Sequence, residues 1–399
     1  TFPNCDNSLM APPSHRAAMM VIALTSLAAT STAFGPTPRA GWVPSAARVK
    51  APAATTATTA ATAAGARTSA TSNSIMRMAA DGAGEESDVM IMMNGLPGAM
   101  GKEVAAACLR RGFTLAPMAL TGPSMPDSVM VDDLEGGAAV EVQLVAGPQS
   151  EDVAEDVEAK VAECQALAKE QGKTLVAIDY THPSAVNNNA ALYARVGLPF
   201  VMGTTGGDRQ KLEATVRANT DASFAAVIAP NMGKQIVALQ AMLEQMATNF
   251  PGSFSGYELK ITESHQSTKA DTSGTAKAVA DTLATLISDE AVAKVQANDY
   301  EEIVRVRDTD AQLAGAPEET PQLNCVPEDA LNGHAFHTYS LVSGDGSVEF
   351  QFRHNVAGRR MYAEGTTDAV GYLAKQIQAK GGATQRIYSM VDVLNAGAL

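Results

Sequence analysis

Cysteine and tryptophan are scarce in this chain of 399 residues, with four of the first and one of the second. Cys108, Cys164 and Cys325 form no Cys-x-x-Cys pair and no other paired spacing, which argues against a disulfide framework or a cysteine-based zinc site. Beyond the N-terminal stretch no segment is apolar for long enough to span a bilayer. The composition therefore points away from disulfide-stapled secreted domains and membrane-embedded proteins.

Acidic residues are absent from residues 7–80, which are rich in Ala, Thr and Ser and carry scattered Arg. Within this stretch residues 19–33 form a short apolar run typical of a signal peptide, and residues 34–80 have transit-peptide composition. Residues 31–36 resemble the Ala-Phe cleavage motif of bipartite presequences in algae with secondary plastids. We predict that residues 1–87 are a disordered, bipartite presequence directing the protein to the plastid (chloroplast) stroma. The alternative is a disordered Ala/Thr-rich tail without an address.

The part of the chain after residue 80 is strongly acidic. Residues 1–80 hold six of the 29 Lys and Arg and one of the 43 Asp and Glu, so the rest has 23 bases, 42 acids and a net charge of −19. Such a surface repels polyanions, so we expect no partner among nucleic acids and no binding to anionic membranes. About 300 residues can bury one large core or two smaller ones.

The first half of the remaining chain alternates strand and helix patterns. Apolar runs of strand length predict strands over residues 88–94, 114–120, 139–145, 174–180, 198–202 and 224–229. Helical spacing predicts helices over residues 102–111, 151–171, 184–196 and 208–219. Such alternation favours an α/β fold, a Rossmann-like doubly wound parallel sheet. We assign residues 88–232 to this dinucleotide-binding domain.

The pattern changes after residue 231. Helices are predicted over 233–249, 273–288 and 367–379, strands over 257–262, 301–307, 335–342, 348–354 and 359–363, and a loop over 313–333. A mixed or antiparallel sheet with helices makes residues 233–360 a second, α+β domain. We expect the last helix to return to the first domain, which residues 361–399 would complete, because a lone helix needs a face to pack on.

Three glycines follow the first strand with the spacing Gly-x-x-Gly-x-x-Gly. Gly95 permits a sharp turn, Gly98 removes a side chain where a pyrophosphate would approach, and Gly101 permits close helix–strand contact. The phosphates would lie on the N–H groups at the helix start, near Ala99 and Met100. The segment therefore predicts a dinucleotide site, although the spacing differs from the commoner Gly-x-Gly-x-x-Gly and glycine turns without a ligand are common.

The residue types at the end of the second strand indicate which dinucleotide the site accepts. NAD-selective folds place an acid there, whereas residues 120–124 contain none. We therefore expect NADPH, with NADH possible, and Lys102 as a candidate phosphate partner. Two further segments follow strands where open α/β sheets bind ligands. They are Gly203-Thr204-Thr205 and Ala229-Pro230-Asn231-Met232, which we assign to cofactor binding; the alternative is two tight turns.

The most informative segment spans residues 263–276. It places His265 four residues before Lys269 and follows both with Ser273-Gly274-Thr275 at a predicted helix start. A proton donor, a cation and helix-start N–H groups suit a small dianionic substrate that is protonated during reaction. The alternative for a lone histidine is an ordinary residue of a surface loop.

The glycine turn, Gly203–Thr205, Ala229–Asn231 and the 263–276 segment, in this order, resemble the 4-hydroxy-tetrahydrodipicolinate reductase family in its plant and algal form. The resemblance implies an NAD(P)H-dependent oxidoreductase of lysine biosynthesis by way of diaminopimelate, acting on a cyclic dicarboxylate imine. It implies His265 and Lys269 as the proton-donating pair, and substrate binding by Gln266, Lys269, Ser273, Gly274 and Thr275. It also implies that residues 233–360 bind substrate and form a homo-oligomer, a tetramer or dimer.

The key segment departs from bacterial members at two points. Gln266 stands where they have a second His. Thr272, and not a Pro, precedes Ser273-Gly274-Thr275, and the loop is one residue shorter. Other functions stay open: another two-domain NAD(P)-dependent dehydrogenase, an NADPH-sensing regulator, or a subunit that regulates a synthase. Asp179 to His182 end a strand and can line the cleft or cap the next helix. We interpret His334, His337 and His354 as structural and expect no metal site.

Overall fold

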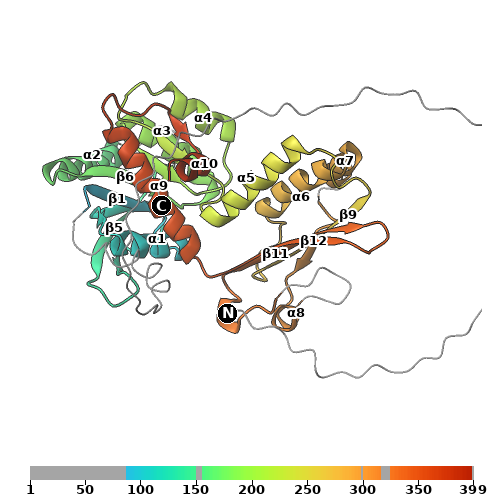
Figure 1. Ribbon diagram of the computed structural model, residues 1–399. Coiled ribbons are helices and arrows are strands. Elements are labelled where there is room, and N and C mark those ends of the chain that lie inside the picture. Colours follow the sequence, from blue (N-terminus) through green and yellow to red (C-terminus); the bar gives the residue numbers. More distant parts are fainter. Residues whose placement is uncertain (1–86, 150–154, 298–299, 316–323, 398–399) are drawn as a thin grey trace, which may run out of the picture. The chain divides into compact units, whose positions relative to one another are not determined.

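The computed structural model describes residues 87–149, 155–297, 300–315 and 324–397 (Figure 1). The predicted targeting presequence lies outside these residues. Within the described part of the chain no helix is both long and apolar enough to cross a membrane.

A six-stranded sheet forms the centre of the first half of the chain. Its order is β13-β8-β7-β6-β1-β2, and every neighbouring pair is parallel. The strands are β1 (Val89–Asn94), β2 (Thr114–Leu115), β6 (Thr174–Asp179), β7 (Phe200–Met202), β8 (Ala226–Ile228) and β13 (Ile387–Tyr388).

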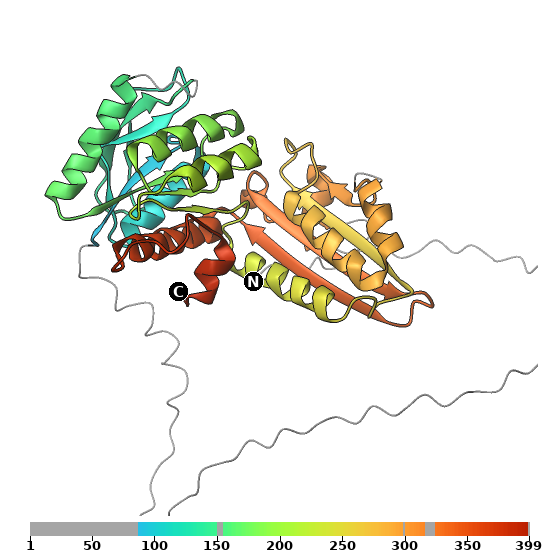
Figure 2. The same ribbon diagram turned by 90° about the horizontal axis from the view of Figure 1, so that it is seen from above.

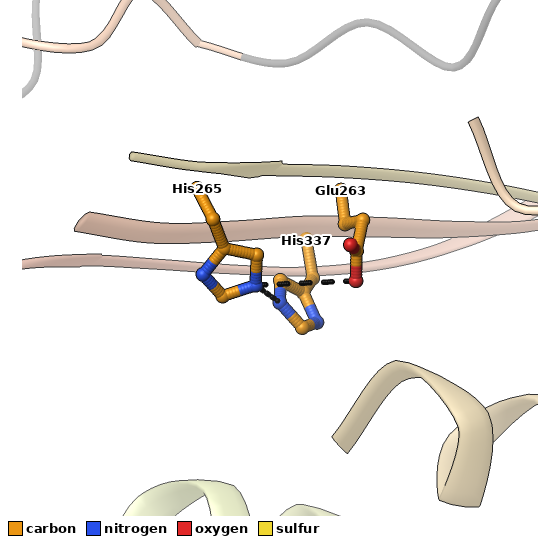
Figure 3. A group of neighbouring side chains, drawn as sticks. All are labelled: Glu263, His265 and His337. Carbon is orange, nitrogen blue, oxygen red and sulfur yellow. Dashed lines mark hydrogen bonds and ion pairs between the residues drawn. The ribbon is translucent and has the colours of Figure 1, made fainter. Parts of the chain in front are cut away.

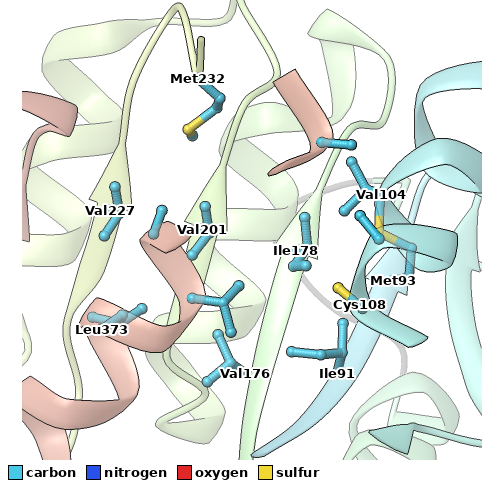
Figure 4. Packing of buried hydrophobic residues seen from close by; sticks show 14 of the residues in the cluster. Ile91, Met93, Val104, Cys108, Val176, Ile178, Val201, Val227, Met232 and Leu373 are labelled. Atoms are coloured by element: carbon cyan, nitrogen blue, oxygen red, sulfur yellow. The ribbon is translucent and has the colours of Figure 1, made fainter. Parts of the chain in front are cut away.

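Helices cover both faces of this sheet. Because side chains alternate along a strand, Ile91 and Met93 face one core while Met90 and Met92 face another. The first core, drawn in Figure 4, is closed by α1 (Ala99–Arg110), α9 (Arg360–Gln378) and α10 (Met390–Asn395). The second is closed by α2 (Glu155–Glu170), α3 (Val186–Val196) and α4 (Arg209–Ala218). The predicted doubly wound parallel sheet is confirmed.

The predicted strand over residues 114–120 is wrong as a single element. It divides at Pro117, whose ring nitrogen has no hydrogen to donate to a ladder. β2 stays in the large sheet, while β3 (Met118–Thr121) joins β5 (Val140–Ala146) and β4 (Ser128–Val131) in a three-stranded mixed sheet. β4 has no counterpart in the sequence prediction.

A second sheet of four strands has the order β10-β9-β11-β12. Its strands are β9 (Tyr257–His265), β10 (Val304–Val306), β11 (His334–Ser343) and β12 (Glu349–Ala357); β9 and β10 are parallel, and the other pairs are antiparallel. A separate core joins this sheet to α5 (Lys234–Asn249), α6 (Gly274–Ile287) and α7 (Asp289–Ala297), and Figure 2 shows the helices along it. The predicted second domain with a mixed sheet is confirmed.

The C-terminal region departs from its prediction. Residues 359–363 were expected to be a strand, but they begin α9, whose buried residues Ala363, Val370 and Leu373 recur at helical spacing. The helix packs closely on the chain after β8: a Cβ at Gly365 would lie 1.8 Å from the carbonyl oxygen of Met232. α9 contacts α1, β6, β7 and β8. β13 and α10 follow it and were not predicted.

The region predicted as a loop over 313–333 is only partly irregular in its described residues. α8 (Thr309–Ala314) covers its beginning, and a 3₁₀ helix (Glu328–Ala330) precedes β11. A second 3₁₀ helix (Pro183–Ala185) leads into α3. Gln312, in α8, is 2% exposed, and its Nε2 donates hydrogen bonds to the carbonyls of His265 and Val306.

Candidate active site

His265 is the last residue of β9, not a loop residue as its sequence context suggested. β9 lies between β10 and β11, so its backbone is held from both sides. The backbone carbonyl of His265 also accepts a hydrogen bond of 2.7 Å from Nε2 of Gln312. The residue is 8% exposed. The alternative of an ordinary surface histidine is therefore wrong.

Glu263, His265 and His337 form a buried cluster, because the first two share one face of β9 and His337 lies opposite Glu263 on β11. Nε2 of His265 lies 3.0 Å from Nε2 of His337 and 3.9 Å from Oε2 of Glu263. Figure 3 shows the other ring nitrogen of His265 directed away from both partners. One nitrogen of His265 is thus engaged inside the protein, and Nδ1 is not engaged by this cluster.

The surroundings of His265 disfavour its charged form. Burial, followed by the positive charges of Arg307 and Lys269, lowers the pKa of His265 to about 3. Burial likewise lowers the pKa of His337 well below its ordinary value, with His354 and His265 adding to the effect. Both imidazoles are neutral at physiological pH in this structure. His265 therefore needs added negative charge nearby before it can carry a proton at this pH.

The same three side chains each offer one ligand atom within 4.8 Å of the others, the kind of group that can hold a cation. Glu263 is already committed, however. Its Oε2 accepts a hydrogen bond of 3.0 Å from the backbone N–H of Ser273, and its Oε1 forms an ion pair with Nη2 of Arg307. The guanidinium supplies the positive charge that the buried carboxylate needs. We therefore describe the cluster as a hydrogen-bonded network.

Arg307 also fixes the loop that carries Lys269. Its Nε donates a hydrogen bond of 2.7 Å to the carbonyl of Lys269, and its Nη2 donates one of 3.2 Å to the carbonyl of Asp271. The Lys269 ammonium forms an ion pair of 2.8 Å with Asp271, which lowers the pKa of that carboxyl. Asp271 therefore restrains the position of the Lys269 ammonium. One arginine joins the buried carboxylate to the loop with the predicted cation.

The other predicted substrate-binding residues lie around the start of α6. Gln266 follows β9 directly, Ser273 is the N-cap residue, and Gly274 and Thr275 open the helix. The Ser273 side chain makes no capping hydrogen bond, and a Cβ at Gly274 would meet open space. Helix geometry leaves the first N–H groups without intrahelical partners, which suits an anion.

The glycine turn lines a cavity of about 370 Å³ at the carboxyl ends of β1, β3 and β6. Gly95 has φ +100°, and a Cβ there would lie 2.3 Å from the Tyr180 carbonyl oxygen. Gly98 is the N-cap of α1, and a Cβ on it would lie 2.8 Å from the Gly95 carbonyl oxygen. Both glycines are therefore required by the close packing of the turn itself, and both also line the cavity. Ala99, Met100 and Gly101 form the first turn of α1 behind it.

The two other predicted cofactor segments do not line this cavity. Gly203 has another explanation, since a Cβ there would lie 2.4 Å from the Tyr180 ring. Thr204 is buried and donates a hydrogen bond of 2.7 Å to Asp179, while Thr205 is exposed. In the second segment Ala229 and Met232 are buried in the core, and Pro230 is exposed. Asn231 donates a hydrogen bond of 3.2 Å to Oγ1 of Thr275.

The sequence did not identify several residues of both sites. The cavity is also lined by Gly147, Pro148 and Gln149, which follow β5; a Gly-Pro pair at a strand end was the available signal. Glu263 and His337 were missed as partners of His265 because β9 was predicted to end at residue 262. Arg307 and Gln312 carry no local motif, so only the fold brings them to the site.

Models of known families match most of the chain. The N-terminal part of dihydrodipicolinate reductase matches residues 89–232, and its C-terminal part matches residues 235–394. The chain belongs to the dihydrodipicolinate reductase family. The family resemblance predicted from the sequence is confirmed.

Two chloroplastic relatives agree with this family assignment. A chloroplastic 4-hydroxy-tetrahydrodipicolinate reductase 1 of Arabidopsis thaliana is 45% identical over 314 residues, covering 77% of this chain and 78% of the relative. A probable chloroplastic counterpart of Oryza sativa subsp. japonica is 44% identical over 308 residues, covering 77% and 79%. Among solved structures, a dipicolinate-bound dihydrodipicolinate reductase from Paenisporosarcina sp. TG-14 has a TM-score of 0.46 at 17% identity, covering 75% of this chain and 97% of that one.

Proposed function

We propose that His265 and Lys269 carry the protonation step when this chain reduces 4-hydroxy-tetrahydrodipicolinate to tetrahydrodipicolinate in lysine biosynthesis by way of diaminopimelate. The observation that supports this most is the buried His265 at the end of β9, backed by Glu263 and His337 and followed within four residues by Lys269. Family membership makes the chain an oxidoreductase, and the residue roles are our assignment.

The chemistry needs an acid beside a cation. The 4-hydroxyl group of the substrate leaves with a ring hydrogen as water, which gives a conjugated cyclic imine. A reduced nicotinamide, when bound, supplies the hydride that adds to this imine. The electron pair released into the ring forms an enamine, whose carbon takes a proton from His265 as the new C–H bond forms. Lys269 holds a substrate carboxylate, and Gln266, Ser273, Gly274 and Thr275 bind carboxylate oxygens at the start of α6.

The low pKa of His265 fits this role once the substrate charge is included. The protein lowers the pKa by burial and by the positive charges of Arg307 and Lys269. A bound dicarboxylate offsets those charges and raises the pKa of the imidazole, because a nearby negative charge favours the protonated form. The imidazole of His265 is therefore protonated mainly when the substrate is bound.

For the cofactor we propose NADPH, with NADH as a second donor. The glycine turn from Gly95 to Gly101 leaves room for a pyrophosphate, and the cavity beside it has no Asp, Glu, Lys or Arg among its described lining residues. Without a carboxylate the cavity does not repel a 2′-phosphate, and without a fixed cation it does not require one. Gly203 to Thr205 and Ala229 to Met232 belong to the proposed cofactor site outside this cavity, where Thr205 and Pro230 are the exposed members.

The remaining expectations form part of the same proposal. We propose that residues 88–232 and 361–399 form the dinucleotide-binding domain, and that residues 233–360 bind the dicarboxylate and form a dimer or tetramer. The chloroplastic relatives support a plastid location for the protein. A regulator that binds NADPH without chemistry is the alternative that the following assay separates.

The test is a coupled assay in which a dihydrodipicolinate synthase and its two substrates generate the imine, and loss of NADPH or NADH absorbance is followed in parallel. We expect His265→Gln to lower turnover by about a hundredfold or more, the loss typical of a missing general acid. Cofactor binding, measured by fluorescence titration, should be unchanged. Wild-type rates in the variant would refute the role of His265, and an inactive wild type would refute the function.

A further inference from the structure

His265 is the first residue in a series of neighbouring polar rings that continues through His337 and Tyr339 to His354. His337 lies 3.0 Å away through Nε2, and Nδ1 of His337 lies 2.7 Å from the hydroxyl of Tyr339. That hydroxyl lies 3.5 Å from Nε2 of His354 on β12. His337 is 1% exposed and Tyr339 is fully buried. Alternation along β11 and pairing with β9 and β12 place these side chains on one face of the sheet.

A hydrogen bond between two imidazole nitrogens requires that only one of them carries the hydrogen. In one arrangement Nε2–H of His265 donates to His337, which then donates from Nδ1 to the Tyr339 oxygen. In the other, the Tyr339 hydroxyl donates to Nδ1 of His337, which donates from Nε2 to His265. The tautomer of His337 therefore depends on the direction taken by Tyr339.

Only the first arrangement accommodates a protonated His265, because both nitrogens of an imidazolium carry hydrogen. Its Nε2–H then needs an acceptor, and His337 supplies one within the buried cluster. The second hydrogen, on Nδ1, lies outside this cluster, and it is the one that we assign to the substrate. The backbone of His334 is a further hydrogen-bonding partner of the His265 ring. In that state the Tyr339 hydroxyl is free to donate to His354.

We propose that His337, held in its tautomer by Tyr339, is the positioning residue that accepts Nε2–H of His265 and makes Nδ1 the nitrogen that delivers the proton. The inference rests on the proposed function of His265. His337 touches neither substrate nor cofactor in this scheme. It acts by stabilising the imidazolium of His265 and fixing its ring.

The charged and titratable groups around the pair are known from each neighbouring element. Glu263 lies on β9, Lys269 on the following loop, Arg307 just after β10, His334 on β11 and His354 on β12. Glu263 is the one acid among them, and it is paired with Arg307. For the Nε2–H of a charged His265, Nε2 of His337 at 3.0 Å is therefore the nearer acceptor, since Oε2 of Glu263 lies 3.9 Å away.

Tyr339→Phe is the most selective test, because it removes one hydroxyl and keeps the ring in the core. Without the Tyr339 oxygen as acceptor, the tautomer of His337 with hydrogen on Nδ1 is no longer favoured. His337 then accepts Nε2–H of His265 less well, and the pKa of His265 in the substrate complex should fall. We expect kcat to fall about tenfold at neutral pH for each unit by which the midpoint of the kcat–pH profile moves down. The loss should shrink as pH is lowered, with KM unchanged.

A companion pair tests the acceptor itself. His337→Gln offers an amide oxygen as acceptor and should retain most of the turnover, whereas His337→Leu should lose it. Ser340→Ala is the matched control, since it removes the buried hydroxyl next to Tyr339 that accepts a 3.1 Å hydrogen bond from Gln351, and its profile should match the wild type. Thermal melting establishes that each variant is folded.

A double variant separates this inference from the function on which it rests. In the His265→Gln background, Tyr339→Phe should cause no further loss, because its effect passes through His265. A wild-type kcat–pH profile for folded Tyr339→Phe would overturn the inference while leaving His265 as the acid. An equal loss at every pH, or an additive loss in the double variant, would overturn it too. Wild-type turnover of His265→Gln alone would overturn the function first.

Discussion

At the scale of single residues, Arg307 joins the two halves of the candidate site. It neutralises the buried carboxylate of Glu263 and holds the carbonyls of Lys269 and Asp271. Nothing in its sequence neighbourhood marks it, since its partners lie far away along the chain. Its contribution is therefore both to stability and to the position of the predicted substrate-binding lysine.

Arg307→Met should leave Glu263 buried without its counter-charge. Removing one partner of a buried pair costs about 3–5 kcal/mol of unfolding free energy. Urea denaturation measures this cost. Arg305→Met is the matched control, because Arg305 lies on β10 two residues before Arg307, is exposed and makes a 3.4 Å contact with the Ala270 carbonyl. We expect the control to change stability by less than about 0.5 kcal/mol. Equal stability of Arg307→Met and Arg305→Met would contradict this account.

At the scale of elements, α9 shows how one helix can need glycine at one position and tolerate other residues at another. A Cβ at Gly365 would collide with the Met232 carbonyl, whereas one at Gly371 would have no heavy atom within 4 Å. Both lie inside the same helix. The first is a packing requirement, and the second is a residue of low helix propensity in an open position.

This difference predicts opposite effects of the same substitution. Gly371→Ala should raise stability by about 0.5–1 kcal/mol, the usual gain of alanine over glycine in a helix interior. Gly365→Ala should lower it by at least about 1–3 kcal/mol, because the helix must move to admit the methyl group. The two unfolding midpoints in urea give the comparison. Destabilisation by Gly371→Ala of the same size would show that the helix tolerates no added methyl group.

Elements also show where reasoning from sequence succeeds and where it stops. β1 and β6 were found because strands buried on both faces read as continuous apolar runs. The polar end of β9 was missed because Glu263, Ser264 and His265 read as a loop. They are buried through partners on β11 and after β10, which no local pattern contains. The site motif was predictable, and its supporting partners were not.

At the scale of the whole molecule, neutral histidines are concentrated in the four-stranded sheet. Burial lowers the pKa of His265 to about 3 and that of His354 to about 4, and it lowers those of His334 and His337 as well. The unfolded chain takes up protons on these side chains near pH 6.5, while the folded protein does not. Stability is therefore full above about pH 6.5 and declines as pH falls below it.

The expected decline is roughly 2 kcal/mol for each of His265 and His354 between pH 7.5 and pH 5. Urea midpoints at the two pH values measure it. His354→Gln should flatten the dependence, because it removes one of the imidazoles whose pKa burial lowers. A midpoint that holds steady down to pH 5 would show that these imidazoles are protonated in the folded protein.

The two core-facing thiols have a consequence for oxidative control. Cys108 is enclosed in the packed layer between the parallel sheet and α1, and burial raises its pKa far above the ordinary range. Burial raises the pKa of Cys164 to about 11. Since thiol exchange requires an accessible thiolate, neither side chain is poised to react with a disulfide or a peroxide. Changes in the redox state of the surroundings would leave both of these sulfur atoms unmodified.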